Sequence, residues 1–118
     1  GTYLKENVDL FFEEITIRPS LLHGDLWQGN TGIDENEIPV IFDPACYYGH
    51  HEAELSIMQM FGGFSSSCFE AYHQLIPKQK GFQKRLWCYQ LYHYFNHYVI
   101  FGSGYRSACL SLLNKLLQ

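Results

Sequence analysis

The sequence lacks both a long apolar run and an excess of positive charge. No stretch of its 118 residues approaches the ~20 consecutive apolar residues that a membrane-spanning helix requires. Residues 1–5 contain no apolar core of a signal peptide, so we expect no secretion signal. The 8 Lys and Arg against 12 Asp and Glu give a formal net charge of −4, which disfavours a nucleic-acid-binding face. We therefore expect neither a membrane nor a nucleic acid among the partners.

Cysteine is sparse, and no C-x-x-C element occurs. The four cysteines stand 20 to 22 residues apart and are Cys46, Cys68, Cys88 and Cys109. Isolated cysteines in an apolar context are typical of buried, reduced thiols in cytosolic proteins. Disulfides or a zinc site are the alternatives. We therefore predict buried thiols and a cytoplasmic location.

Apolar residues, by contrast, are abundant. Hydrophobic residues make up 47% of the chain and aromatic residues 17%, enough to form one core in one modest domain. Apolar residues recur at helical spacing in most of the chain. The helices expected from this periodicity and from its Pro and Gly stops span residues 3–14, 52–61, 65–76, 82–101 and 105–117. We predict a mainly α-helical α+β fold and a single domain over residues 1–118.

A small β-element interrupts the helices. Residues 31–33 and 38–42 are apolar or β-branched, and the polar residues 34–37 between them are typical of a hairpin turn. Residues 44–49 are predicted to be irregular. The hairpin would carry the chain away from the preceding polar loop and return Asp43 to it.

That polar loop contains an acid and an amide at a spacing used by phosphotransferases. Asp25 follows His23 by two positions, and Asn30 follows Asp25 by five. In kinases with this spacing, the Asp lies beside the attacking hydroxyl and the Asn binds a magnesium ion. Asp43 follows the next strand, where a second metal-binding Asp is expected. Taken alone, each is a common turn or strand-end residue, but the order and spacing of all three favour phosphoryl transfer.

Longer segments around this motif resemble one family. They are residues 20–30 (SLLHGDLWQGN), 41–50 (IFDPACYYGH), 52–56, 60–64 and 91–102. The chain resembles the fructosamine-3-kinase (ketosamine-3-kinase) family, which belongs to the aminoglycoside-phosphotransferase-like group with a protein-kinase-like fold. The resemblance implies an ATP- and Mg²⁺-dependent enzyme. Its substrate would be the 3-hydroxyl of a ketosamine, a fructosamine or ribulosamine adduct of an amine or protein lysine, and the outcome would be deglycation.

The resemblance also implies roles for individual residues. Asp25 would be the catalytic base, and Asn30 and Asp43 would hold the metal. His23 would support the loop through its ring, and Glu54 matches a helix acid that braces the loop. The candidates for substrate contact are Trp27, Gln28 and His50. For Trp27 the simpler alternative is a position in the core, and for His50 it is a hydrogen bond to the backbone.

Parts of such a kinase are missing from the sequence. We find no Gly-rich strand–loop–strand and no Lys in a Val-Ala-x-Lys-like strand, which form the nucleotide-binding lobe. We therefore expect a C-terminal lobe, carrying the metal Asp on its hairpin, with the N-terminal lobe absent. Such a lobe would be inactive alone and would expose apolar surface near the hairpin and the loop, favouring self-association.

Two other functions are alternatives. A free-standing lobe would act as a non-catalytic binding module, and a kinase of the same fold would act on another hydroxyl, such as that of an aminoglycoside or choline. His93 and His97 stand four apart, a spacing found in metal sites, although a core or pocket wall is the simpler interpretation for this aromatic segment.

Overall fold

The chain forms two compact units, of which one contains every candidate site residue. The computed structural model describes residues 8–118, apart from the side chains of residues 98 and 101. Residues 17–78 make up one unit, and the remaining described residues make up the other. The fold is mainly helical with four short strands among the described residues, as predicted for an α+β chain. The prediction of a single domain stays a prediction.

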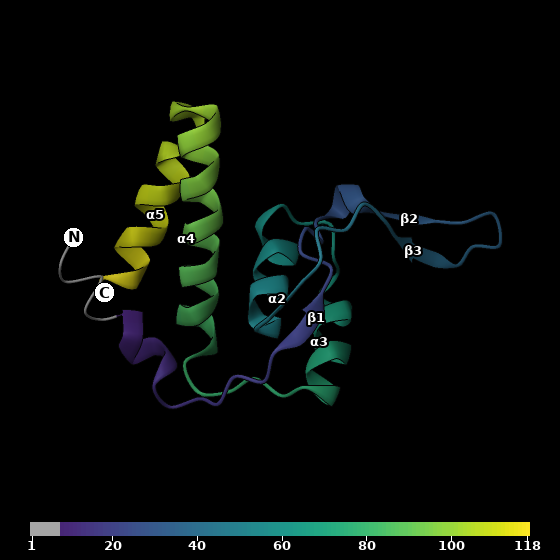
Figure 1. The fold of residues 1–118 in the computed structure, drawn as a ribbon, viewed down its shortest axis with the longest axis horizontal. Helices are drawn as coiled ribbons and strands as arrows, with labels where there is room; N and C mark the ends of the chain where they lie inside the picture. The colour runs from purple at the N-terminus through teal and green to yellow at the C-terminus, as the bar shows by residue number, and fades with distance from the viewer. Residues whose placement is uncertain (1–7) are drawn as a thin grey trace. The chain divides into compact units, whose positions relative to one another are not determined.

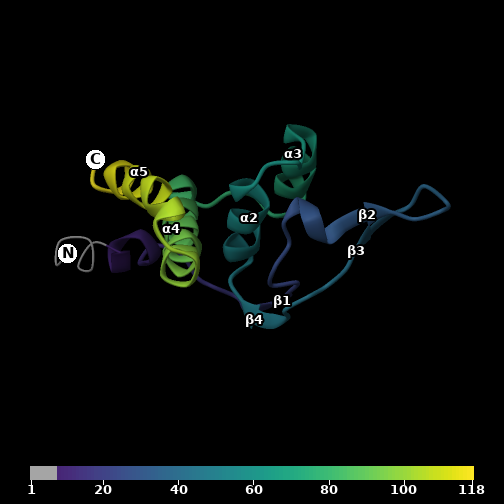
Figure 2. The same cartoon turned by 90° about the horizontal axis from the view of Figure 1, so that it is seen from above.

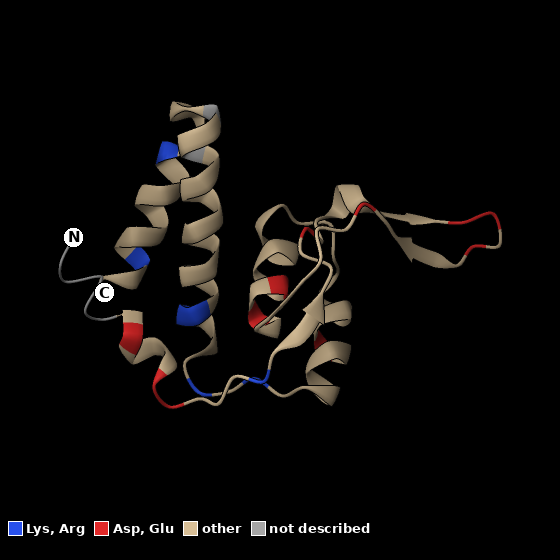
Figure 3. Ribbon diagram, in the orientation of Figure 1, with Lys and Arg blue, Asp and Glu red and all other residues tan. Residues whose placement is uncertain are grey.

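Within residues 17–78, a hairpin projects from the polar loop of residues 23–30 (Figure 1). Strands β2 (Thr31–Ile33) and β3 (Pro39–Ile41) pair antiparallel, with Gly32 opposite Val40. The Asp34 carboxylate holds the turn, because its Oδ1 accepts hydrogen bonds from the backbone N–H groups two and four residues later, at 2.8 and 2.9 Å. Figure 3 shows the acidic residues gathered at this turn. The predicted hairpin is confirmed.

A second pair of strands was not predicted. Its two strands flank the loop and the hairpin in sequence. Strand β1 (Ser20–Leu22) pairs antiparallel with β4 (Tyr47–Gly49), with Leu21 opposite Tyr48 (Figure 2). The prediction that residues 44–49 are irregular is therefore wrong for the last three. A three-residue strand shows too little alternation to be recognised, and its partner lies on the far side of the hairpin in sequence.

Two helices follow β4. Helix α2 (His51–Met60) buries Ala53, Leu55, Ile57 and Met58, which form much of the core of this unit with Leu22 of β1. Gly62 and Gly63 follow with φ angles of +69° and +94°, values that glycine adopts without strain, and they end the helix. Helix α3 (Ser66–Leu75) starts at an N-cap, Ser65. Both predicted helices are confirmed.

The other unit is a pair of long helices. Helix α4 (Phe82–Phe101) and helix α5 (Arg106–Leu116) lie side by side in both Figure 1 and Figure 2, joined by Gly102 and the short helix η2 (Ser103–Tyr105). Both helices and the glycine break agree with the sequence. The buried apolar side chains of this unit are Leu86, Cys109, Leu112 and Leu116.

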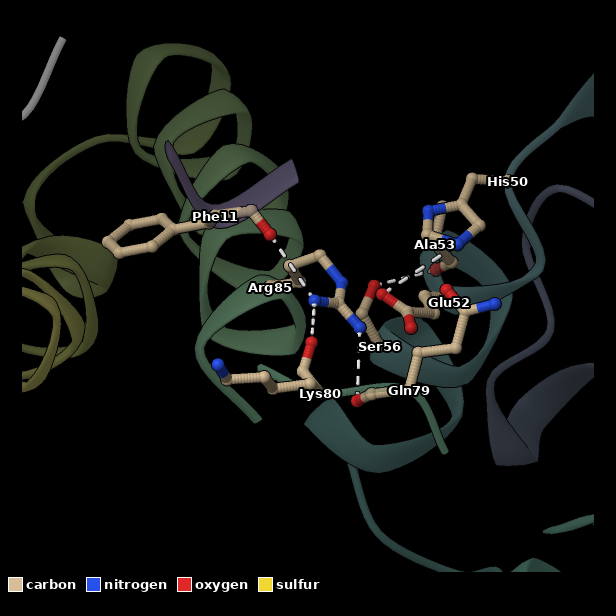
Figure 4. A network of polar contacts seen from close by, with 8 residues as sticks. All are labelled: Phe11, His50, Glu52, Ala53, Ser56, Gln79, Lys80 and Arg85. Carbon is tan, nitrogen blue, oxygen red and sulfur yellow. Dashed lines mark hydrogen bonds and ion pairs between the residues drawn. The ribbon is translucent and has the colours of Figure 1, made fainter. Parts of the chain in front are cut away.

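A buried arginine ties the start of α4 to the first helical residues. The Arg85 guanidinium is 1% exposed and donates to the backbone oxygens of Phe11, Gln79 and Lys80 (Figure 4). Three carbonyl acceptors offset the cost of burying this charge. The chain is helical at residues 8–12. The rest of the predicted N-terminal helix, residues 3–7, lies outside the described residues.

Two further expectations concerned the burial of the cysteines and the lack of a membrane-spanning helix. All four cysteines are free thiols, but Cys46 and Cys68 are exposed, so the prediction of buried thiols is wrong for these two. Cys46 lies in the open segment before β4, and Cys68 lies in the first turn of α3, a helix without a buried residue. Within residues 8–118, no helix is long and apolar enough to cross a membrane.

Candidate functional site

The polar loop of residues 23–30 closes on itself through Asn30. The amide Nδ2 of Asn30 donates to the backbone oxygen of Asp25 at 2.9 Å and to its carboxylate Oδ2 at 3.2 Å. Asn30 is buried, whereas Asp25 is exposed. Because both atoms facing Asn30 are acceptors, the amide nitrogen must point toward Asp25 and the amide oxygen away from it. The structure therefore brings the predicted base and the predicted metal ligand together.

His23 supports this loop from beneath. Its ring Nε2 donates to the backbone oxygen of Phe42 at 2.7 Å, and its Nδ1 accepts from the backbone N–H of Asp25 at 3.2 Å. These partners place the proton of the neutral ring on Nε2. Both ring nitrogens are used within the protein, so His23 holds the loop and is not available as a base.

The hairpin returns Asp43 to the loop, as predicted. The residue before it, Phe42, donates its backbone N–H to the oxygen of Asn30 at 3.0 Å, and Ala45 after it donates to the oxygen of His23 at 2.8 Å. Asp43 is exposed and has a φ of +54°, a left-handed conformation that is uncommon outside glycine. Strained backbone of this kind occurs often at functional sites, where the surroundings hold it in place.

Glu54 of α2 braces the start of the loop. Its carboxylate accepts the backbone N–H of His23 at 2.6 Å and that of Gly24 at 3.1 Å. Gly24 has a φ of +91°, and a Cβ there would lie 1.9 Å from the backbone oxygen of Ala45. A side chain at position 24 would collide with the backbone of Ala45, so only glycine fits there.

The segment after Asp25 lies on the turn that follows α2. The Trp27 ring packs edge-on against Phe61, with 5.9 Å between ring centroids, and is 40% exposed. The alternative of a core position for Trp27 is therefore wrong. Gln28 is also exposed, and its side chain lies against Gly63. Both side chains are accessible to a ligand.

His50 is placed differently from these two. It is buried, and its Nε2 lies 3.7 Å from a carboxylate oxygen of Glu52, itself 1% exposed (Figure 4). With His51, they form a group whose ligand atoms lie within 4.8 Å of one another. Tyr72 stacks on His51, and its pKa is raised, first by burial and then by the charges of Glu54 and Glu52. This burial does not favour direct substrate contact by His50.

In the other histidine pair, the ring of His97 is hydrogen-bonded to the backbone of His93. Nδ1 of His97 donates to the backbone oxygen of His93 at 2.7 Å, one helical turn earlier. This hydrogen bond occupies one ring nitrogen and disfavours the metal-site alternative.

Comparison with known proteins identifies the family. A family model described as fructosamine kinase matches residues 2–118. The chain belongs to the fructosamine kinase family. Among curated members, it is 51% identical over 118 residues to the Arabidopsis thaliana protein-ribulosamine 3-kinase, chloroplastic, covering 100% of this chain and 36% of that protein. It is 57% identical over 105 residues to the mouse ketosamine-3-kinase, covering 89% of this chain and 34% of that protein.

Solved structures agree with this fold. A crystal structure from Thermobifida fusca, provisionally named a fructosamine-3-kinase, superposes with a TM-score of 0.84 at 28% identity, covering 98% of this chain and 40% of that one. One from Haemophilus somnus, named in the same way, gives 0.81 at 27% identity, covering 100% and 41%. This fructosamine kinase chain thus spans about a third of the length of the curated relatives it matches.

Two residues at this site were missed from sequence. Phe61 and Gly63 support Trp27 and Gln28, yet the sequence pattern around them indicates only the end of a helix. The pair Gly62–Gly63 was the available sequence signal of a second role for this turn, because one left-handed glycine is enough to end a helix.

Proposed function

We propose that this chain is the catalytic part of an ATP-dependent kinase that phosphorylates the 3-hydroxyl of ketosamines and so promotes deglycation. One observation carries the proposal. The Asn30 amide is bonded to Asp25, while the segment after β3 that contains Asp43, residues 42–45, is bonded to both Asn30 and His23. Two relatives bear the names ribulosamine 3-kinase and ketosamine-3-kinase, which supports this substrate class.

Asp25 would act on the acceptor hydroxyl. Asn30 holds its Oδ2, which leaves Oδ1 to accept a hydrogen bond from the substrate hydroxyl. The hydroxyl oxygen then forms a bond to the γ-phosphorus, the bond from that phosphorus to the departing ADP oxygen breaks, and the hydroxyl proton passes to Asp25. An exposed carboxylate fixed at one oxygen suits this role, because the substrate must reach the other.

The donor atoms fit magnesium. The Asn30 amide oxygen is turned away from Asp25, and Asp43 offers carboxylate oxygens in the adjoining segment just after β3. Mg²⁺ prefers hard oxygen ligands and needs few from the protein when phosphates complete its shell. Bound there, the ion would offset the negative charge of the phosphate oxygens.

We further propose that the chain corresponds to a kinase-like C-terminal lobe whose metal Asp lies on the hairpin. A nucleotide-binding lobe from outside residues 1–118 would complete the site, and the 118 residues alone would not turn over ATP. A non-catalytic binding module remains the alternative for the isolated chain. The substrate names of the relatives weigh against aminoglycoside or choline. A cytoplasmic location stays a prediction, since one relative is named chloroplastic.

A hybrid kinase tests the proposed function. The N-terminal part of the mouse ketosamine-3-kinase, joined to this chain, should phosphorylate a ketosamine with ATP. Asp25→Asn should then lower kcat by about 10²- to 10⁴-fold, the usual contribution of a general base. The matched control is Glu70→Gln, an exposed acid on α3, which should leave kcat unchanged. No turnover by the hybrid, or an Asp25→Asn variant with unchanged kcat, would contradict the proposal.

The hairpin suggests that the isolated chain self-associates. Its exposed apolar side chains are Ile33, Ile38, Val40, Ile41 and Phe42. By the strand register, Ile33 and Ile41 lie on one face of the hairpin and Val40 on the other, and so many exposed apolar side chains favour association. Sedimentation of the chain should show association that increases with concentration, and a single monomeric species at high concentration would count against this.

A further inference from the structure

Helix α2 and the turn after it hold the catalytic loop at two places. Glu54, in the first turns of α2, binds the backbone at the start of the loop. Phe61 and Gly63, just beyond its end, receive the side chains of Trp27 and Gln28. In sequence, Asp25 lies between the two parts of the loop that are held in this way. All of these residues belong to the unit of residues 17–78.

The second support depends on the absence of a side chain. At Gly63, a Cβ would lie 2.2 Å from Oε1 of Gln28, 2.4 Å from its Cδ and 2.7 Å from its Cγ. Such distances are far below contact, so the Gln28 side chain lies directly on the glycine backbone. The Trp27 ring is packed in the same way, because a Cβ at Gly29 would lie 2.1 Å from its Cη2. Two consecutive side chains of the loop are thus seated on glycines.

We infer that Phe61 and Gly63 are positioning residues for the reaction, acting through Trp27 and Gln28 on the acceptor side of the site. Neither residue touches the reacting atoms. They hold the two exposed side chains that the acceptor would meet, Trp27 by ring packing and Gln28 by its close approach to the Gly63 backbone. This inference deepens the proposed function and rests on it for its kinetic consequence.

The effect should appear on the acceptor and not on the nucleotide. Small displacements of a catalytic group lower rates steeply, by as much as about 10²-fold for 1 Å. In the hybrid kinase, Gly63→Ala should lower kcat/KM for the ketosamine by roughly 10- to 100-fold, while the KM for ATP stays unchanged. Phe61→Ala should raise the KM for the ketosamine in the same selective way.

A neighbouring glycine supplies the control. Gly62 also has a positive φ, +69°, but a Cβ there would have nothing within 4 Å. Gly62→Ala should therefore stay close to the parent in ketosamine kinetics. Removing the obstructing side chain should also rescue Gly63→Ala, so that Gln28→Ala with Gly63→Ala falls no further than Gln28→Ala with Gly62→Ala. Equal losses in the two glycine variants, no rescue, or a matching change in the KM for ATP would overturn the inference.

A spectroscopic arm separates this inference from the proposed function. In the 118-residue chain with Trp87→Phe, Trp27 is the remaining tryptophan. Phe61→Ala should shift its emission to longer wavelength, because the ring loses its edge-on partner, whereas Gly62→Ala should leave the emission unchanged. If the parent hybrid phosphorylates no ketosamine, the proposed function fails while this shift still supports the packing. Unchanged emission in Phe61→Ala would overturn the inference whatever the activity.

Discussion

Loss of the Glu54 carboxylate should destabilise the protein by an amount that the geometry bounds. Glu54 accepts the backbone N–H groups of His23 and Gly24 at 2.6 and 3.1 Å. A hydrogen bond to a charged group contributes about 1.5–3 kcal/mol, so two would contribute roughly 3–6 kcal/mol if fully shielded from water. Glu54 is only half-buried, and water can replace part of both bonds. We therefore expect Glu54→Ala to cost about 2–4 kcal/mol.

Glu54→Gln sharpens this test. The amide keeps one oxygen for one N–H group and presents an NH₂ group to the other, so the expected cost is about 1–3 kcal/mol. Urea unfolding measures the change as a shift of the midpoint at constant slope. The control, Glu70→Gln on the exposed face of α3, should stay within about 0.5 kcal/mol of the parent. Equal midpoints for the two Gln variants would refute the role of Glu54 as a brace.

Three further predictions concern backbone and thiols. Gly24→Ala should cost about 2–4 kcal/mol in urea unfolding, since it adds a backbone clash to left-handed strain, whereas Gly102→Ala, with a similar φ of +90° and open space, should cost only about 1–2 kcal/mol. Ser65→Ala should cost about 0.5–1 kcal/mol through loss of the N-cap of α3. Burial raises the pKa of Cys88 to about 11, so its thiolate fraction at pH 8 falls roughly 100-fold below that of an ordinary thiol. Iodoacetamide at pH 8 should therefore modify the exposed Cys46 and Cys68 before Cys88, which should react readily only as the pH approaches 11; equal rates for Cys88 and the exposed thiols at pH 8 would contradict this.

Local pattern predicted most of the elements because each has a clear local cause. The hairpin follows from β-branched residues on either side of a turn that Asp34 stabilises by itself. Helix α4 follows from the long stretch between Gly81 and Gly102, which contains neither Gly nor Pro. Strand β4 was missed because it is stabilised by pairing with β1, and a non-local partner leaves no local signature.

The sequence predicted that Asp25 and Asn30 share a loop and that His23 and Glu54 support it, but it did not predict the contacts of Trp27 and Gln28. Spacing alone pointed to Asp25 and Asn30, and the structure joins them by a hydrogen bond. The seat of Gln28 on Gly63 could not be predicted, because it depends on two backbone segments meeting in space. The exposure of Cys46 was missed for a related reason, since apolar sequence neighbours do not determine whether a loop lies in the core.

The distance between the two supports has a consequence for how this family can vary. Between Glu54 and Gly63 the chain is mostly one helix, which has a fixed rise and rotation for every residue. A single inserted or deleted residue there would turn one support by about 100° and shift it by about 1.5 Å relative to the other. Repacking of neighbouring side chains can thus accommodate substitutions along α2. A change in the length of the helix would instead break the contacts of one of the two supports with the loop. The length of α2 therefore sets the separation of the two supports. Among relatives, the number of residues in this helix should vary less than their identity.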